Sequence, residues 1–115
     1  MALTIEEKIN ENVVVLELTG SLDAGSIENL YEKIKESKQD KHSANMVLVL
    51  SALEFISSAG WSAFIEASKD LRGENGDLRL ASMRETASRI FSIMGLEAWI
   101  KTYPSAEAAV KSYAE

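Results

Sequence analysis

The run Met46–Ser51, "MVLVLS", is the feature of this sequence that most constrains the fold. It is continuously apolar up to its last residue, and it contains two β-branched valines. A strand with one solvated face alternates apolar and polar residues, whereas a strand covered on both faces does not. The run therefore predicts a central strand of a largely parallel sheet that carries helices on its two sides.

Segments on either side of this run alternate between strand-like and helix-like patterns. Strands are expected over residues 3–8, 13–20, 46–51, 78–82 and 99–102, the first two joined as a hairpin. Helices are expected within 21–39, from about 57–60 to 71, over 84–95 and from 104 to 113. The order β-β-α-β-α-β-α-β-α predicts an α/β fold, with residues 1–115 as one domain around a mixed, mostly parallel sheet.

Particular residues indicate where these helices begin and end. Asp23 or Ser26 is suited to cap the first helix, because short polar side chains accept hydrogen bonds from free amides. Gly95 is suited to follow the third helix, and Pro104 to stand in the first turn of the fourth. The apolar stripe of the third helix is expected at Ala87, Ile90, Ile93 and Met94.

Composition excludes several classes of function. Eighteen acidic against twelve basic residues leave a net charge of −6, so nucleic acid and anionic membrane surfaces are poor partners. The start "MALTIEEKIN" lacks the apolar core of a signal peptide, and no apolar run approaches the length of a spanning helix, which favours a cytoplasmic location. Without cysteine there is no disulfide and no thiolate site, and we expect no metal site.

Two serines, Ser57 and Ser58, stand where the central strand ends and the next helix begins. In open α/β sheets, ligand chemistry concentrates at the carboxyl ends of strands, near the free amides of the following helix. Helix capping alone explains one such serine, since serine is a favoured N-cap residue. A phosphate on the other would also be tolerated there, because the helix N-terminus favours negative charge.

Catalytic and nucleotide-binding interpretations of the turn are weaker. A nucleophilic serine needs a base, the turn "SSAGW" is not a G-x-S-x-G elbow, and the single histidine, His42, lies in a polar loop. A phosphate-binding loop would need more glycine and a lysine, whereas the turn contains only Gly60. We therefore expect no catalytic residue and no cofactor.

The sequence resembles the STAS-domain family, and specifically the bacterial anti-sigma factor antagonists. The resemblance lies in the strand "MVLVLSALEF", the turn "ISSAG", the segment "GSLDAGSIENL" and the ending "LRLASMRETASRIFSIMGLEAWIKTYPSAEAA". Each pattern is degenerate, but their order and spacing together cover nearly the whole chain. The resemblance implies a STAS fold.

Many family members carry D-S-S-G or D-S-T-G at this turn and are phosphorylated on the serine after the aspartate. Matching Gly60 to the family's glycine places Ser57 at the aspartate, Ser58 at the phosphoacceptor and Ala59 at the next position. The sequence departs from the family in having serine at Ser57, without the acid, and Trp61 in place of an aliphatic residue. With Ser58 as the phosphoacceptor, Ser57 is expected to support the turn or to cap the helix.

Two neighbouring residues have two interpretations each. Trp61 has the helical spacing of a core anchor with Phe64 and Ile65, but an exposed tryptophan beside Ser58 would be a binding hot spot. Asp23 is either a helix cap or a surface acid, and the resemblance implies that it lies close to the phosphorylation site.

The resemblance implies a binding switch without enzymatic activity. The unphosphorylated chain would bind an anti-sigma factor that is also a serine kinase, phosphorylation of Ser58 would end that binding, and a serine phosphatase would restore it. Magnesium and nucleotide would belong to the kinase. One alternative is an accessory subunit that docks in a transporter or signalling complex, and another is a hydrolase that uses Ser57 or Ser58.

Overall fold

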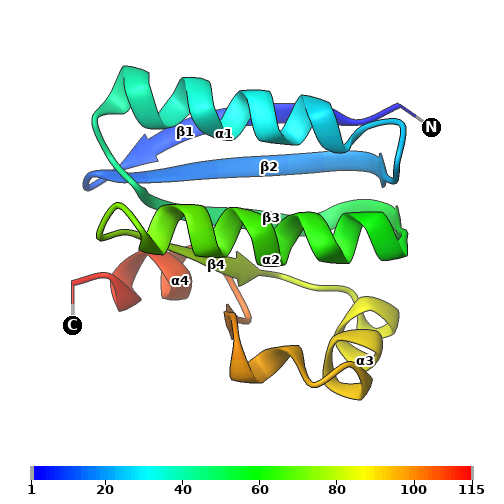
Figure 1. Ribbon diagram of the computed structural model, residues 1–115. Coiled ribbons are helices and arrows are strands. Elements are labelled where there is room, and N and C mark those ends of the chain that lie inside the picture. Colours follow the sequence, from blue (N-terminus) through cyan, green and yellow to red (C-terminus); the bar gives the residue numbers. More distant parts are fainter. Residues whose placement is uncertain (1, 115) are drawn as a thin grey trace.

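Five strands form one mixed sheet in the order β1-β2-β3-β4-β5, in a computed structural model that describes residues 2–114 (Figure 1). β1 pairs antiparallel with β2, and the other neighbours are parallel. The strands are β1 Thr4–Asn10, β2 Val13–Leu22, β3 Asn45–Ile56, β4 Asp77–Ala81 and β5 Lys101–Tyr103. The helices are α1 Ile27–Lys41, α2 Ser58–Arg72, α3 Glu85–Ile93, the 3₁₀ turn η1 Leu96–Ala98, and α4 Ala106–Ser112. The predicted α/β class and element order are confirmed.

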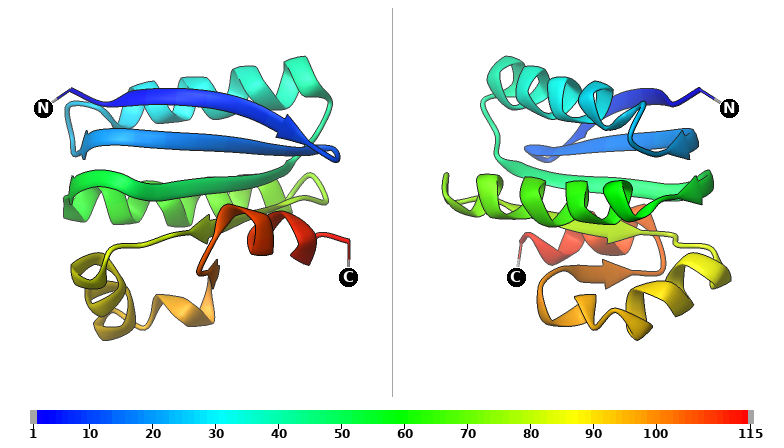
Figure 2. Two further views of the ribbon diagram at one scale, coloured as in Figure 1. Left: turned by 180° about the vertical axis from the view of Figure 1, so that it is seen from behind. Right: turned by 45° about the vertical axis from the view of Figure 1, so that its right-hand side comes forward.

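Helices cover the two faces of this sheet unequally. α1 and α2 run side by side over one face, and the short α4 lies on the other (Figures 1 and 2). In β3, Met46 and Leu48 belong to the large core under α1 and α2, whereas Val47 belongs to a smaller core with Val110 of α4. The continuous apolar run is therefore buried on both faces, as predicted.

The prediction for the buried face of α3 is wrong. Phe91 is the buried residue of this helix, while Ile90, Ile93 and Met94 are exposed. α3 lies beyond the end of β4 and does not lie across the sheet (Figure 1). Because only its Phe91 side faces the core, the rest of its apolar stripe remains in solvent.

The observed helix ends agree in part with those predicted from the sequence. Gly95 adopts a left-handed conformation (φ 68°) directly after Met94, the C-cap of α3, as expected of a glycine in that place. Pro104, however, lies before α4, because Ser105 is the N-cap and its hydroxyl accepts a 3.1 Å hydrogen bond from the Ala108 amide. The last strand is also displaced, from the expected 99–102 to Lys101–Tyr103.

Candidate functional site

The serine turn lies beside the loop that follows β2. Leu22, the last residue of β2, pairs with Ile56, the last residue of β3, so the two strands end together. The Ser57 amide then donates a 2.9 Å hydrogen bond to the Leu22 carbonyl. α1 and α2 both begin at this end of the sheet, at the right in Figure 1. The site is thus built from two strand-to-helix connections joined by backbone contacts.

Ser57 is the N-cap of α2. Its backbone is extended (φ −82°, ψ 174°), and its hydroxyl accepts a 3.2 Å hydrogen bond from the Gly60 amide. Its carbonyl accepts the first intrahelical bond, from the Trp61 amide at 3.0 Å. The prediction that Ser57 caps the helix is therefore confirmed, and its hydroxyl is occupied in the folded state.

Ser58 is the first residue of α2 and is exposed, unlike its half-buried neighbours Ser57 and Ala59. The α2 amides that precede the first intrahelical bond carry partial positive charge close to its side chain. No acidic residue occupies the first turn of α2. The two hydroxyls thus differ: Ser57 holds the helix end, and Ser58 faces solvent.

Gly60 is required by the close approach of the two connections. A Cβ atom at Gly60 would lie 2.8 Å from the Leu22 carbonyl oxygen and 2.9 Å from the Ile56 Cγ2 atom. The first contact is with backbone, which cannot move aside as a flexible side chain could. The glycine therefore allows α2 to start directly against the end of β2.

Asp23 organises the loop between β2 and α1. Its carboxylate accepts a 3.0 Å hydrogen bond from the Gly25 amide, and its carbonyl accepts 3.0 Å bonds from the Ser26 and Ile27 amides. Ser26 holds the N-cap position of α1 without a side-chain capping bond, because its hydroxyl oxygen instead accepts a 3.0 Å hydrogen bond from the Asp23 amide. The same hydroxyl donates to the Ser21 carbonyl. Neither predicted side chain caps α1 directly, and Asp23 instead shapes the loop next to the serine turn.

Trp61 is a core residue. It is 3% exposed, it meets Phe64 edge-on at 5.7 Å between ring centroids, and it contacts Phe91 of α3 at 6.2 Å. The interpretation as a core anchor is confirmed, and the alternative of an exposed hot spot is wrong. Its position on the inner side of α2 places the indole under α3, away from solvent.

An apolar groove that the sequence analysis missed lies next to the serine turn. It encloses about 340 Å³ between the end of β3 and α3, and its lining includes Phe55, Ile56, Arg84 and Ile90, with Trp61 at its base. Phe55 is 54% and Ile90 is 37% exposed. No local sequence signal indicated the groove, because strand alternation places Phe55 on the same face as Leu53, which is buried.

His42 lies far from Ser58. It is the exposed C-cap of α1, at the end opposite the serine turn. The 15 residues of α1 span about 22 Å, so His42 cannot serve as a base for Ser58. Within residues 2–114, no three acidic or histidine side chains are grouped to hold a metal ion. None of the helices described in the structure is long and apolar enough to cross a bilayer.

Comparisons with known proteins give one consistent fold. The anti-sigma-B factor antagonist of Bacillus subtilis is 26% identical over 111 residues, which cover 96% of this chain and all of that protein. An anti-sigma factor antagonist from Mycobacterium paratuberculosis superposes with a TM-score of 0.86 at 22% identity, covering 99% of this chain and 96% of that chain.

Two further similarities are to solved structures of the same fold. The Bacillus antagonist SpoIIAA has been solved in unphosphorylated and phosphorylated forms. Their TM-scores are 0.78 and 0.71, each at 22% identity, covering 98% and 97% of this chain and 96% and 99% of theirs. A murine anion transporter, Slc26a9, contains a similar region, with a TM-score of 0.78 at 14% identity over 99% of this chain and 22% of the transporter.

The comparison with family models identifies the domain. The model of the STAS domain matches residues 4–109, which include every strand and the first four residues of α4. The match extends through the serine turn, the Asp23 loop and the apolar groove. The chain therefore belongs to the STAS domain family.

Proposed function

We propose that this chain is an anti-sigma factor antagonist whose binding is switched by phosphorylation of Ser58. The observation that carries the proposal is the difference between the two serines: the Ser57 hydroxyl is bonded to the Gly60 amide, while Ser58 is exposed at the start of α2. A kinase can therefore reach Ser58 without breaking the helix cap. The antagonist function of the B. subtilis relative supports the assignment.

The unphosphorylated chain binds its partner through the serine turn and the apolar groove beside it. Phe55 and Ile90 expose apolar surface at the groove, and Arg84 adds a cation at its edge. Apolar groups that become desolvated at the centre of an interface supply most of its affinity. The partner in this proposal is an anti-sigma factor that is also a serine kinase, and its capture releases the sigma factor.

Phosphorylation ends binding by changing the surface and leaving the fold intact. A phosphate adds a charge of about −1.5 to −2, which the free amides and positive end of α2 accommodate. The same charge and bulk at a tightly packed contact are unfavourable, because the partner would have to desolvate the phosphate. A serine phosphatase resets the switch. Structures of SpoIIAA are known in both forms, which supports the idea that this fold accepts the modification.

The proposed partner also implies the role of this chain and the place where it acts. The domain, residues 1–115, is a kinase substrate without catalytic activity of its own, and it acts in the cytoplasm, where sigma factors act. Its net charge of −6 would speed association with a basic surface on the kinase. Ser57, Asp23, Ala59 and Gly60 shape the neighbourhood of Ser58, and Trp61 supports it from the core.

Phosphopeptide mass spectrometry on the chain from its own cells tests the site of modification. We expect phosphate on Ser58 in wild type, its loss in Ser58→Ala and its retention in Ser57→Ala. Phosphate confined to another residue, or none under growth and stress conditions, contradicts the proposal.

Binding to the purified anti-sigma factor kinases of the same organism tests the switch itself. Ser58→Asp should weaken binding at least tenfold while Ser58→Ala binds like wild type, with circular dichroism to verify the fold of both. Equal binding by Ser58→Asp and wild type would overturn the switch.

A second candidate is an accessory subunit that docks permanently in a transporter or signalling complex. Serine at position 57, where many antagonists carry an acid, favours it, as does the similar region in an anion transporter. In that case Ser58 carries no phosphate, and Ser58→Ala leaves the assembly unchanged. The phosphopeptide measurement therefore separates the two candidates.

A further inference from the structure

A second hollow lies between α1 and α2, on the outer side of the two helices and away from the apolar groove. It encloses about 490 Å³, within the size range of small-molecule sites. Its floor is apolar, formed by Ile34 of α1 together with Ala67 and Leu71 of α2. Its walls carry charged and polar groups, so the hollow has an apolar centre and a polar rim.

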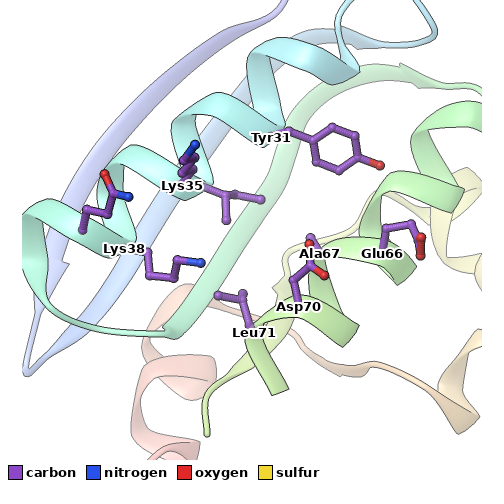
Figure 3. Close-up of a pocket in the computed structure, with 9 residues that line it drawn as sticks. Tyr31, Lys35, Lys38, Glu66, Ala67, Asp70 and Leu71 are labelled. Atoms are coloured by element: carbon purple, nitrogen blue, oxygen red, sulfur yellow. The ribbon is translucent and has the colours of Figure 1, made fainter. Parts of the chain in front are cut away.

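The two walls carry opposite charges. Lys35 and Lys38 stand on α1, and Glu66 and Asp70 stand on α2 (Figure 3). The Tyr31 ring extends from α1 toward α2, near the Glu66 side chain. Burial, followed by the nearby carboxylates of Glu66, Asp70 and Glu28, raises the pKa of Tyr31. Its hydroxyl is thus protonated at neutral pH, and this end of the hollow has negative potential.

The opposite charges are close enough to share one hollow but do not neutralise each other. Lys38 is bonded to Glu74, just beyond the end of α2, and this pair joins the two helices at one end. Among the residues that the structure describes, no ion pair within 4.0 Å joins Lys35 to Glu66 or Asp70. The carboxylates of Glu66 and Asp70 can therefore bind a cationic group of a ligand, and the Lys35 ammonium can bind an anionic group.

We propose that the hollow between α1 and α2 binds a small zwitterion, a molecule with an ammonium group and a carboxylate joined by a short apolar stem. The ammonium lies at Glu66 and Asp70 beside the Tyr31 hydroxyl, and the carboxylate lies at Lys35. The stem packs on Ile34 and Ala67, and Leu71 lies fully buried beneath them. Charge-assisted hydrogen bonds at both ends favour a zwitterion over a molecule with a single charge, because a single charge is complemented by only one of the two walls.

The length of the ligand follows from the helix geometry. Tyr31 and Lys35 are four residues apart on α1, which corresponds to about 6 Å along the helix axis. A ligand that spans the hollow therefore separates its two charges by several methylene groups. 6-Aminohexanoate has this form, and hexanoate and hexylamine are matched probes that each lack one charge.

Titration of the ¹⁵N-labelled chain, followed by amide chemical shifts, tests the proposal without any partner protein. We expect 6-aminohexanoate to give saturable shifts centred on Tyr31 and Ala67, and hexanoate and hexylamine to bind at least tenfold more weakly. Glu66→Gln and Lys35→Gln should each weaken 6-aminohexanoate at least tenfold. Glu32→Gln, an exposed change on α1 outside the hollow, should leave binding unchanged.

Two outcomes overturn the proposal. One is the lack of saturation by 6-aminohexanoate at tens of millimolar. The other is an equal response to hexylamine, which would show only general attraction of cations to an acidic protein. Because all three variants change exposed side chains, the dispersion of their amide spectra verifies the fold. Neither outcome depends on Ser58, so failure here leaves the proposed switch unaffected.

Discussion

The Ser57 amide and the Leu22 carbonyl are joined by a 2.9 Å hydrogen bond that fastens the connection after β3 to the connection after β2. Through this bond the exposed Ser58 and the loop organised by Asp23 belong to one surface. The two helices that begin there cover the same face of the sheet (Figure 1). A modification at Ser58 therefore changes a surface that two connections share, and the predictions below test the contacts that hold it.

Ser57→Ala removes the N-cap of α2. We expect a loss of about 1 kcal/mol in the free energy of unfolding, because the Gly60 amide loses its acceptor. Urea denaturation measures this loss. Ser62→Ala is the matched control: Ser62 is exposed in the second turn of the same helix, beyond the capping positions, and its replacement should cost nothing. Equal stability of Ser57→Ala and wild type would show that the cap contributes little.

Gly60→Ala tests the close approach of α2 to β2. The added methyl group would lie 2.8 Å from the Leu22 carbonyl oxygen, so we expect destabilisation by about 1–3 kcal/mol in thermal or urea unfolding. Gly73→Ala is its control, since Gly73 has helical φ (−65°) and only ordinary contacts. That control should be neutral or slightly stabilising. A stable Gly60→Ala variant would contradict the steric argument.

Phe55→Ser tests the contribution of the apolar groove to partner binding. Under the proposed function, the exposed Phe55 side chain becomes buried by the kinase, so we expect roughly tenfold weaker binding in a calorimetric titration. Ile9→Ser removes a similarly exposed apolar side chain (49% exposed) from the edge strand β1 and should leave affinity unchanged. If both variants bind alike, the groove is not part of the interface.

Glu7→Gln should lower stability at neutral pH but not in acid. The hydrogen bond from the Ser37 hydroxyl (2.8 Å), and then the contact with Lys33 (3.0 Å), lowers the pKa of Glu7 below its ordinary value of 4.5. A carboxylate with a lowered pKa stabilises the fold above its unfolded-state pKa and loses that contribution as pH falls through the folded-state value.

We therefore expect wild type to exceed Glu7→Gln by about 1 kcal/mol at pH 7, and the difference to shrink below about pH 4.5. Urea unfolding at a series of pH values measures it. Glu6→Gln, a change of an exposed neighbour on β1, is the matched control and should leave stability at pH 7 unchanged. If the difference in unfolding free energy between wild type and Glu7→Gln does not depend on pH, the difference arises from packing and not from the charge of Glu7.

Tyr113→Phe should weaken the attachment of the C-terminal segment. The Tyr113 hydroxyl lies 2.7 Å from the Met46 carbonyl and 2.8 Å from the Asp77 carbonyl, which joins the end of α4 to β3 and β4. Burial raises the pKa of this hydroxyl, so it is protonated and can donate at neutral pH.

Loss of this donor should cost about 1–2 kcal/mol in urea unfolding. Tyr103→Phe is the comparison, because no residue within 2–114 forms a hydrogen bond to the Tyr103 hydroxyl. Equal losses in the two variants would contradict a specific role for the Tyr113 bond.

The order of the elements and the position of the serine turn were predictable from the sequence alone. The run Met46–Ser51 requires cover on both faces, and alternating strand and helix periods on either side leave few arrangements besides a largely parallel sheet. Ser57 as a cap was predictable as well, because it stands directly between a strand pattern and a helix pattern.

Only the tertiary structure decided which apolar side chains stay in solvent. Helical spacing placed Ile90 and Trp61 in equivalent stripes, yet Trp61 is buried and Ile90 is exposed. A stripe is buried only where its helix lies over the sheet, and α3 lies beyond the end of β4 (Figure 1). The apolar groove and the hollow between α1 and α2 depend on such placements, which follow from packing between distant segments and leave no local pattern in the sequence.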